Sequence, residues 1–116
     1  MNQFVLLLPH EPGRYEDLPE DDYMSIIADY VAWVEARSAE GVYKGGHKLT
    51  ADRRVMVEAG NGGIEAHDSP LAEAAEVLGG LMVIEAKDFD AAVEIAKSHP
   101  HLVHNSRIEI RQIHEV

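Results

Sequence analysis

The fold is decided by residues 67–85, HDSPLAEAAEVLGGLMVIE, which combine a polar turn, a short Ala/Glu segment and an apolar strand opened by two glycines. The strand predicted at residues 78–86 is apolar on both faces, as is typical of a strand inside a sheet. Its two glycines predict a β-bulge or a close approach of two backbones. Residues 68–70, Asp-Ser-Pro, end the preceding strand, and residues 71–77 predict a helical turn or a short helix.

Strand and helix patterns alternate on both sides of this stretch. Residues 3–8 form a near-continuous apolar run that stops at Pro9, which predicts a strand buried on both faces. A helix is predicted from Pro19 to Glu40, because proline suits a first helical turn, acidic residues follow it, and apolar residues recur at helical spacing up to Gly41. Residues 42–50 return to a strand pattern.

Strand and helix patterns also alternate in the second half of the chain. Residues 54–58 and 64–67 predict a hairpin, closed by the tight-turn sequence at 59–63. Asp88 is predicted to cap a helix that ends at residues 98–100, and residues 107–113 alternate like a strand with one covered face. This order predicts an α+β fold, a ferredoxin-like βαββαβ sandwich with an inserted β-hairpin, as a single domain over the whole chain, residues 1–116.

Two helices on one face of such a sheet leave the other face uncovered. The second faces of the strands at 4–8 and 78–84 are apolar and must be buried. The economical cover is a second copy of the chain. We therefore expect a homodimer whose sheets pack face to face, a dimeric α/β-barrel arrangement.

Composition excludes several classes of protein. The net charge of −11, from 21 acidic and 10 basic residues, repels nucleic acid and anionic lipid, although Lys44, Lys48, Arg53 and Arg54 form one small basic group. No apolar segment is long enough to cross a membrane, and the 116 residues hold no cysteine, which fits a cytoplasmic location. We expect no nucleic-acid or membrane partner.

The stretch around residue 70 resembles a family signature. Asp68-Ser69-Pro70-Leu71, with Glu73, Glu76 and Leu78-Gly79-Gly80, resembles the Asp-Gly-Pro-Phe block and the following strand of the DGPF branch of the YCII-related proteins. Ser69 and Leu71 depart from the glycine and phenylalanine of that block. The resemblance implies the sandwich fold, but many proteins of the family have no assigned reaction. The first helix also lacks the histidine that other branches place there as half of a His-Asp pair.

His47 and Asp68 are the candidate catalytic residues. Each is predicted near the end of a strand, so a dimeric sheet could bring both to the rim of one cleft, where an imidazole and a carboxylate can move a proton on a small acid. Alternatively, Asp68 only accepts backbone hydrogen bonds in the turn before Pro70 while His47 is half exposed. The residues expected to bind the ligand are Tyr43, His67, Ser69, Gly79 and Gly80.

The remaining candidates favour structural roles. His99, His101 and His104 surround Pro100, and we interpret them as solvated loop histidines because no acidic residue stands beside them at metal-ligand spacing. Tyr43, Tyr30 and Trp33 could line an apolar pocket, but the shared apolar face of Tyr30 and Trp33 on the first helix favours the core for these two. We expect no metal and no cofactor.

Two classes of function remain open. One is a small-molecule-binding protein or enzyme that takes an acid-like organic molecule in a pocket between helix, sheet and dimer mate. The other is a non-catalytic interaction or regulatory module, since proteins of the DGPF branch are often linked with alternative sigma factors. The first requires a cavity that joins the polar residues, and the second an exposed apolar surface.

Overall fold

The computed structural model describes residues 1–70 and 74–115. Its elements follow one another as β1 (Asn2–His10), α1 (Glu20–Ala39), β2 (Tyr43–Lys48), β3 (Val55–Gly60), β4 (Gly63–Asp68), β5 (Val77–Ala86), α2 (Phe89–Lys97), α3 (His101–Asn105) and β6 (Glu109–Gln112). The short helix predicted at 71–77 falls largely on residues 71–73, which lie outside the described residues, and Val77 already belongs to β5.

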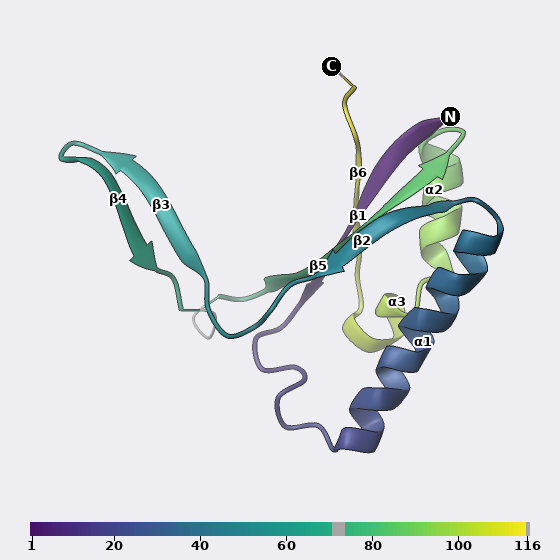
Figure 1. Ribbon diagram of the computed structural model, residues 1–116, viewed down its shortest axis with the longest axis horizontal. Coiled ribbons are helices and arrows are strands. Elements are labelled where there is room, and N and C mark those ends of the chain that lie inside the picture. The colour runs from purple at the N-terminus through teal and green to yellow at the C-terminus, as the bar shows by residue number, and fades with distance from the viewer. Residues whose placement is uncertain (71–73, 116) are drawn as a thin grey trace.

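Four strands form one antiparallel sheet in the order β2-β5-β1-β6. Without the hairpin, this is the strand order of a ferredoxin-like βαββαβ sandwich, so the predicted fold is confirmed. The hairpin β3-β4 forms a separate two-stranded ribbon. Figure 1 shows α1, α2 and α3 on one side of the sheet and this ribbon extending away on the other.

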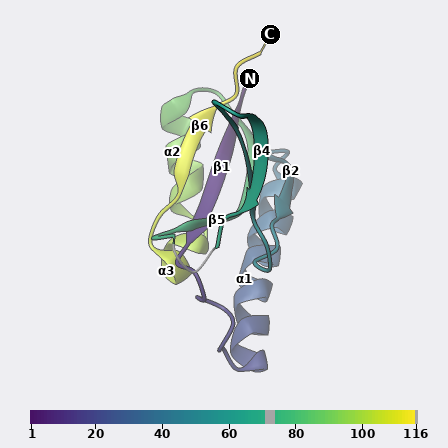
Figure 2. The same cartoon turned by 90° about the vertical axis from the view of Figure 1, so that its left-hand side faces the viewer.

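The core lies between the sheet and the helices. Alternate residues of β1, namely Phe4, Leu6 and Leu8, are buried on the helix side, where Ile84 of β5 joins them. Burying each of these side chains contributes roughly 2 kcal/mol. In Figure 2 the strands lie in front of the helices, so the described helices cover one face only.

The opposite face of the sheet carries half-buried apolar side chains. Val5 pairs with Val83 and Leu7 with Leu81 across β1 and β5, and paired residues share a face. This is the apolar second face that the sequence predicts. The face-to-face homodimer and its barrel stay a prediction for that surface.

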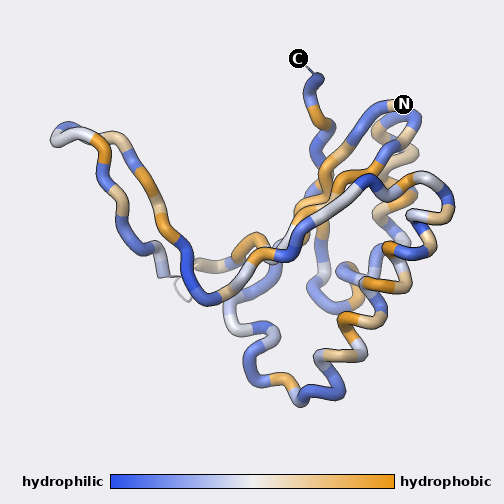
Figure 3. The backbone as a smooth tube through the Cα atoms, viewed as in Figure 1, coloured by the Kyte–Doolittle hydropathy of each residue, from blue (hydrophilic) through white to orange (hydrophobic). Residues whose placement is uncertain are grey.

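The ribbon β3-β4, called the arm below, has one apolar face. Its register places Val55, Val57, Ala59, Ile64 and Ala66 on the same side. Val57 is 67% exposed and Ile64 is 79% exposed, so the described chain leaves this face uncovered. Figure 3 shows apolar stretches on the arm as well as on the central strands. Because an isolated two-stranded hairpin is only marginally stable in water, this apolar face favours contact with another molecule.

The glycine pair at the start of β5 marks a β-bulge, as predicted. Leu8 pairs with Gly80 and Pro9 with Leu78, so Gly79 is the extra residue between the two pairs. A Cβ atom on Gly79 would lie 2.8 Å from His10 Nε2. Glycine therefore lets the end of β1 approach β5 closely.

Helix α3 and the last strand differ from the prediction. Pro100 precedes α3 with a φ of −64°, a value that suits a helix start, whereas the sequence pattern predicts it only as the end of α2. The strand at 107–113 is shorter than predicted, because β6 includes only Glu109–Gln112.

Asp88 caps α2 as predicted, and this cap gives a test of the fold. Its carboxylate accepts a hydrogen bond of 2.8 Å from the backbone N–H of Ala91. We expect Asp88→Ala to lower the free energy of unfolding by about 1 kcal/mol in urea denaturation, because one helix-end donor loses its partner. Asp88→Asn should keep most of the stability, since its amide oxygen can accept the same bond. An equal loss in both variants would contradict the capping role.

Candidate functional site

A cavity of about 610 Å³ lies between the N-terminal half of α1, the loop at 11–19 and the helix-covered face of the sheet. Its apolar wall comes from Ile26 and Ile27 of α1 and from Leu8 and Met82 of the sheet. Tyrosines, histidines and two cations supply its polar groups. This volume suits a small organic molecule.

The cavity exists because α1 is anchored at one end. Trp33, in its C-terminal half, is only 7% exposed and donates a hydrogen bond of 2.9 Å from Nε1 to Ser98 Oγ. The N-terminal half carries Tyr23 and the two isoleucines, which line the cavity and remain partly exposed. Space is therefore left between that half and the sheet.

A glycine keeps the floor of the cavity open. A Cβ atom on Gly46 would lie 2.8 Å from Tyr43 Oη and 2.7 Å from the backbone oxygen of Leu81. Both distances are too short for a carbon atom, so a larger residue would displace Tyr43 or the strand.

Two basic side chains line the cavity. Lys48 Nζ donates to the hydroxyl of Tyr23 and lies 4.9 Å from the centre of that ring. Arg14 donates from Nε and Nη2 to the carbonyl of His104, at 3.2 and 3.1 Å, and its guanidinium lies 5.3 Å from the Tyr15 ring centre. In the described part of the chain, Glu16 is the one acidic residue of the lining. The cavity is thus locally positive in a chain of net charge −11.

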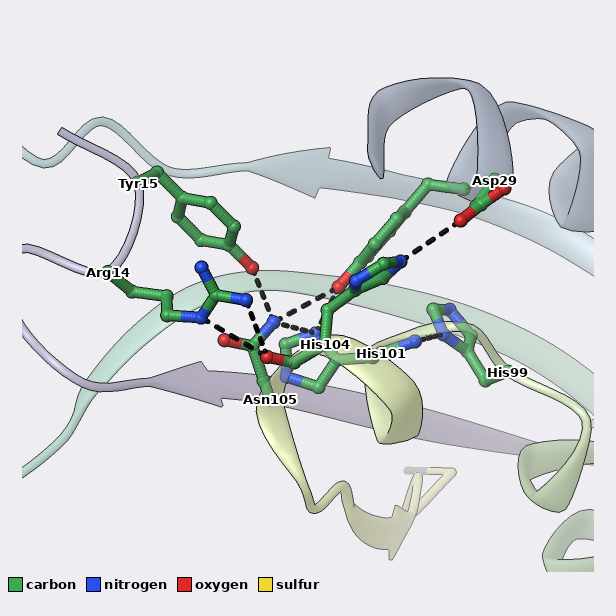
Figure 4. A network of polar contacts seen from close by, with 8 residues as sticks. Arg14, Tyr15, Asp29, His99, His101, His104 and Asn105 are labelled. Carbon is green, nitrogen blue, oxygen red and sulfur yellow. Dashed lines mark hydrogen bonds and ion pairs between the residues drawn. The ribbon is translucent and has the colours of Figure 1, made fainter. Parts of the chain in front are cut away.

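A hydrogen-bonded network forms the polar end of the cavity (Figure 4). Tyr30 Oη lies 2.6 Å from His101 Nδ1, and His101 Nε2 lies 2.6 Å from the backbone oxygen of Pro9. Asn105 Nδ2 donates to the hydroxyls of both Tyr15 and Tyr30, the latter at 3.3 Å. Tyr15, Tyr30 and His101 all line the cavity.

The Pro9 carbonyl determines the tautomer of His101. A carbonyl oxygen can only accept, so Nε2 carries the proton and donates it to Pro9. In the neutral ring Nδ1 is then an acceptor, and the Tyr30 hydroxyl donates to it. Burial lowers the pKa of His101 and raises the pKa of Tyr30, so both side chains are neutral near pH 7.

His99 is a buried structural histidine. It is 1% exposed, its Nδ1 accepts a 3.0 Å hydrogen bond from the backbone N–H of His101, and its Nε2 lies 3.3 Å from Met82 Sδ. Its ring centre is 4.3 Å from that of Trp33. Burial lowers the pKa of His99 to about 4. The prediction of solvated loop histidines is therefore wrong for His99, and also for His101, which is 2% exposed.

The third histidine of this group is partly exposed. His104 Nε2 lies 3.0 Å from Asp29 Oδ2 of α1, which links α3 to α1 (Figure 4). Its side chain is 18% exposed. His104 thus helps to position α3 rather than standing free in a loop.

Four of the predicted site residues line the cavity, namely Tyr43, His47, Gly79 and Gly80. His47 pairs with Leu81, so its side chain shares the uncovered face of the sheet with Leu7. Its neighbour Lys48 points the other way, toward Tyr23 of α1. His47 therefore borders the cavity through its backbone while its imidazole is directed away from it.

The other three predicted residues lie at the base of the arm and do not line the cavity. Asp68 Oδ1 forms an ion pair of 2.8 Å with Arg53 Nε. His67 Nε2 lies 3.6 Å from Glu58 Oε2, and Ser69 Oγ accepts a 3.0 Å hydrogen bond from Arg54 Nη2. Within one chain, the structure does not bring Asp68 together with His47. Their joint catalytic role stays a prediction that requires a second copy.

The sequence prediction missed the polar end of the cavity. Helical spacing favours Tyr30 in the core over a pocket and does not indicate its contact with His101, which is itself 92 residues from the Pro9 carbonyl that it contacts. Arg14 lies in a loop whose path the sequence does not specify. Lys48 belongs to the basic group that the sequence predicts as a solvated strand pair or an anion-facing rim. The fold disperses that group, since Lys44 pairs with Glu85 and Arg53 with Asp68.

Comparison with known proteins agrees with this architecture. Residues 2–116 match the YCII-related domain, and the chain belongs to this family. Its assignment to the DGPF branch stays a prediction. No curated protein matches the chain.

One similar solved structure is the 5-chloro-2-hydroxyhydroquinone dehydrochlorinase of Burkholderia phenoliruptrix, in complex with 2,5-dihydroxybenzoquinone. It is 13% identical in sequence with a TM-score of 0.57, and the match covers 98% of this chain and 95% of that one. At this identity the likeness concerns the fold.

No described helix combines the length and hydropathy needed to span a bilayer. Within residues 1–70 and 74–115, no three histidine, aspartate or glutamate side chains are grouped so that they could hold a metal ion.

The buried His99 predicts a pH-dependent stability. Because its pKa is about 4 in the folded chain and 6.5 for an unperturbed histidine, the unfolded chain binds more protons between these values, and stability falls as the pH drops through this range. We expect the free energy of unfolding to fall by about 2 kcal/mol between pH 7 and pH 5, with a smaller contribution from His101 in the same direction.

Urea denaturation across this pH range measures the effect. His99→Asn should be less stable at pH 7 but lose clearly less stability on acidification, because the titrating ring is absent. His114→Asn, which changes an exposed histidine, should keep the wild-type slope. A His99→Asn slope equal to that of the wild type would refute the assignment.

Proposed function

We propose that this protein binds a small planar organic anion in the cavity between α1 and the sheet. The observation that carries the proposal is a cavity of about 610 Å³ whose walls are mainly apolar and which contains Lys48 and Arg14 in an otherwise acidic protein. Apolar walls favour a flat hydrocarbon ring, and the cations favour its acidic group.

The arrangement of side chains suggests how such a ligand is oriented. Lys48 and the Tyr23 hydroxyl line the cavity and can hold a carboxylate. The Tyr15 ring contacts the Tyr23 ring, with 6.1 Å between the ring centres, and Tyr15, Tyr30 and His101 can hold a hydroxyl or carbonyl oxygen of the same ligand. The dehydrochlorinase of similar fold, which was solved with 2,5-dihydroxybenzoquinone, supports a ligand of this size and shape.

Titration calorimetry with benzoate tests the proposal. We expect one benzoate to bind per chain, Lys48→Met to weaken binding about tenfold because a charge-assisted hydrogen bond is lost, and the uncharged benzamide to bind more weakly than benzoate. Ile27→Trp should abolish binding, since the larger side chain fills the cavity.

Lys87→Met is the matched control for charge. It removes an exposed lysine that does not line the cavity, so benzoate should bind as it does to the wild type. Circular dichroism checks that each variant is folded. Benzoate binding that neither Lys48→Met nor Ile27→Trp weakens would refute this site.

The homodimer belongs to the same proposal, with the uncovered sheet face as its interface. Val5, Leu7, Leu81 and Val83 form a half-buried apolar strip there, and His47 lies beside it. Two-fold packing of this face buries the strip against itself. The arm extends on the same side and could bring Asp68 of one copy toward the other. This is the arrangement on which the predicted roles of His47, Asp68, His67 and Ser69 depend.

Sedimentation velocity tests the dimer. We expect the wild type to sediment as a dimer and Leu7→Glu as a monomer, because two carboxylates would be buried at the two-fold interface. Val103→Glu is the matched control, since Val103 is 82% exposed on α3, away from the sheet face. A monomeric wild type at high concentration would remove the proposed interface and the roles that depend on it.

The arm supports a second candidate function, a module that associates with another protein. Its apolar face is exposed, with Val57 at 67% and Ile64 at 79%. Such a module would also fit a cytoplasmic regulatory role. The two functions are compatible because the cavity opens on the helix side of the sheet and the arm lies on the other side.

A further inference from the structure

The Tyr30–His101 pair has the geometry of a proton-transfer site facing the cavity. The Tyr30 hydroxyl donates a 2.6 Å hydrogen bond to His101 Nδ1. The other ring nitrogen, His101 Nε2, donates a 2.6 Å hydrogen bond to the Pro9 carbonyl. Both side chains line the cavity, so a ligand can approach the pair from the open side. The rest of the inference rests on the function proposed above.

We propose that Tyr30 and His101 together accept the proton of a hydroxyl group on the bound ligand, which assigns the ligand to the phenols or enols that also carry an acidic group.

The hydrogen bonds at Tyr30 leave one position for this hydroxyl. A tyrosine oxygen donates one hydrogen bond and accepts two. Its proton is given to His101, and Asn105 Nδ2 fills one acceptor position at 3.3 Å. The second acceptor position faces the Tyr15 hydroxyl, which interacts with Tyr30 in the ligand-free protein. Because Tyr15 accepts from Asn105 and keeps its own proton, it can turn that proton to the ligand oxygen and leave the position on Tyr30 to the ligand hydroxyl.

In this proton transfer, each O–H or N–H bond that forms in the site replaces one that breaks. The ligand O–H bond breaks, its electron pair stays on the ligand oxygen, and the proton forms a new O–H bond at Tyr30. The original Tyr30 proton moves to His101 Nδ1, so Tyr30 remains neutral and His101 becomes an imidazolium. The imidazolium still donates Nε2–H to Pro9, and the ligand oxygen gains the negative charge.

The neighbouring charges are compatible with both charged products. Arg14, which also lines the cavity, favours the negative ligand oxygen. Glu76 favours the imidazolium, whereas His10 and His104 disfavour it when they are protonated. Burial keeps the pKa of His101 low, so the imidazole is neutral and ready to accept before the ligand binds.

The test uses 4-hydroxy-3-nitrobenzoate, a carboxylate whose phenolate form absorbs visible light. The protein is titrated with it at a pH below the pKa of the free phenol. Calorimetry in buffers with different heats of ionisation counts the protons released. We expect the wild type to bind the phenolate without proton release, because the proton stays on the pair. Tyr30→Phe, which removes a single oxygen, should lower the bound ratio of phenolate to phenol about tenfold or more.

Controls separate this proposal from the binding proposal. The methoxy analogue, 4-methoxy-3-nitrobenzoate, has no proton to give and should bind both wild type and Tyr30→Phe. His101→Asn should match Tyr30→Phe, and His114→Asn should match the wild type.

Two results would contradict the proton-accepting role of Tyr30 and His101 but leave the cavity as a binding site. One is a bound probe that stays a phenol in the wild type. The other is phenolate formation that is equal in wild type and Tyr30→Phe and releases one proton to the buffer. If neither compound binds, the proposed function fails, and the role of the pair fails with it.

Discussion

The anchoring of α1 at one end is the constraint on which the cavity depends. Trp33 is the one buried residue of this helix among those described, and it holds the C-terminal half through Ser98 and the ring of His99. A helix of 20 residues is about 30 Å long, so its other half extends well beyond this anchor. The space between that half and the sheet is the cavity, and Gly46 leaves this space open because it has no side chain.

The same anchor explains why two histidines are buried. His99 packs on Trp33 and accepts from the backbone of α3, while His101 connects Tyr30 of α1 to the Pro9 carbonyl of β1. Because both rings are shielded from water, charging either ring costs free energy. The fold is therefore more stable when both rings are neutral. Before a ligand binds, the same burial keeps His101 neutral, so its Nδ1 can accept a proton in the proposed transfer.

Much of the fold could be predicted because its signals are local. Pro19 and Asp88 mark helix starts, Gly79 and Gly80 mark a bulge, and the alternation along β1 and β5 identifies the central strands. Helix α3 was missed because Pro100 can end one helix or begin the next, and the residues beside it do not distinguish these cases. The site was harder to predict, since His101 and Pro9 meet across 92 residues.

Local periodicity and turn chemistry in the sequence thus determined the order of elements, the sandwich and the apolar second face of the sheet, because each depends on residues close together in the chain. Tertiary structure alone decided which polar groups meet. Strand register directed His47 away from the cavity and Lys48 into it, and the separate arm carried Asp68 elsewhere. The alternation of residues in a strand and the spacing of residues in a helix do not indicate contacts between distant parts of the chain. Tyr30 and His101 are partners because α1 and α3 both pack against β1.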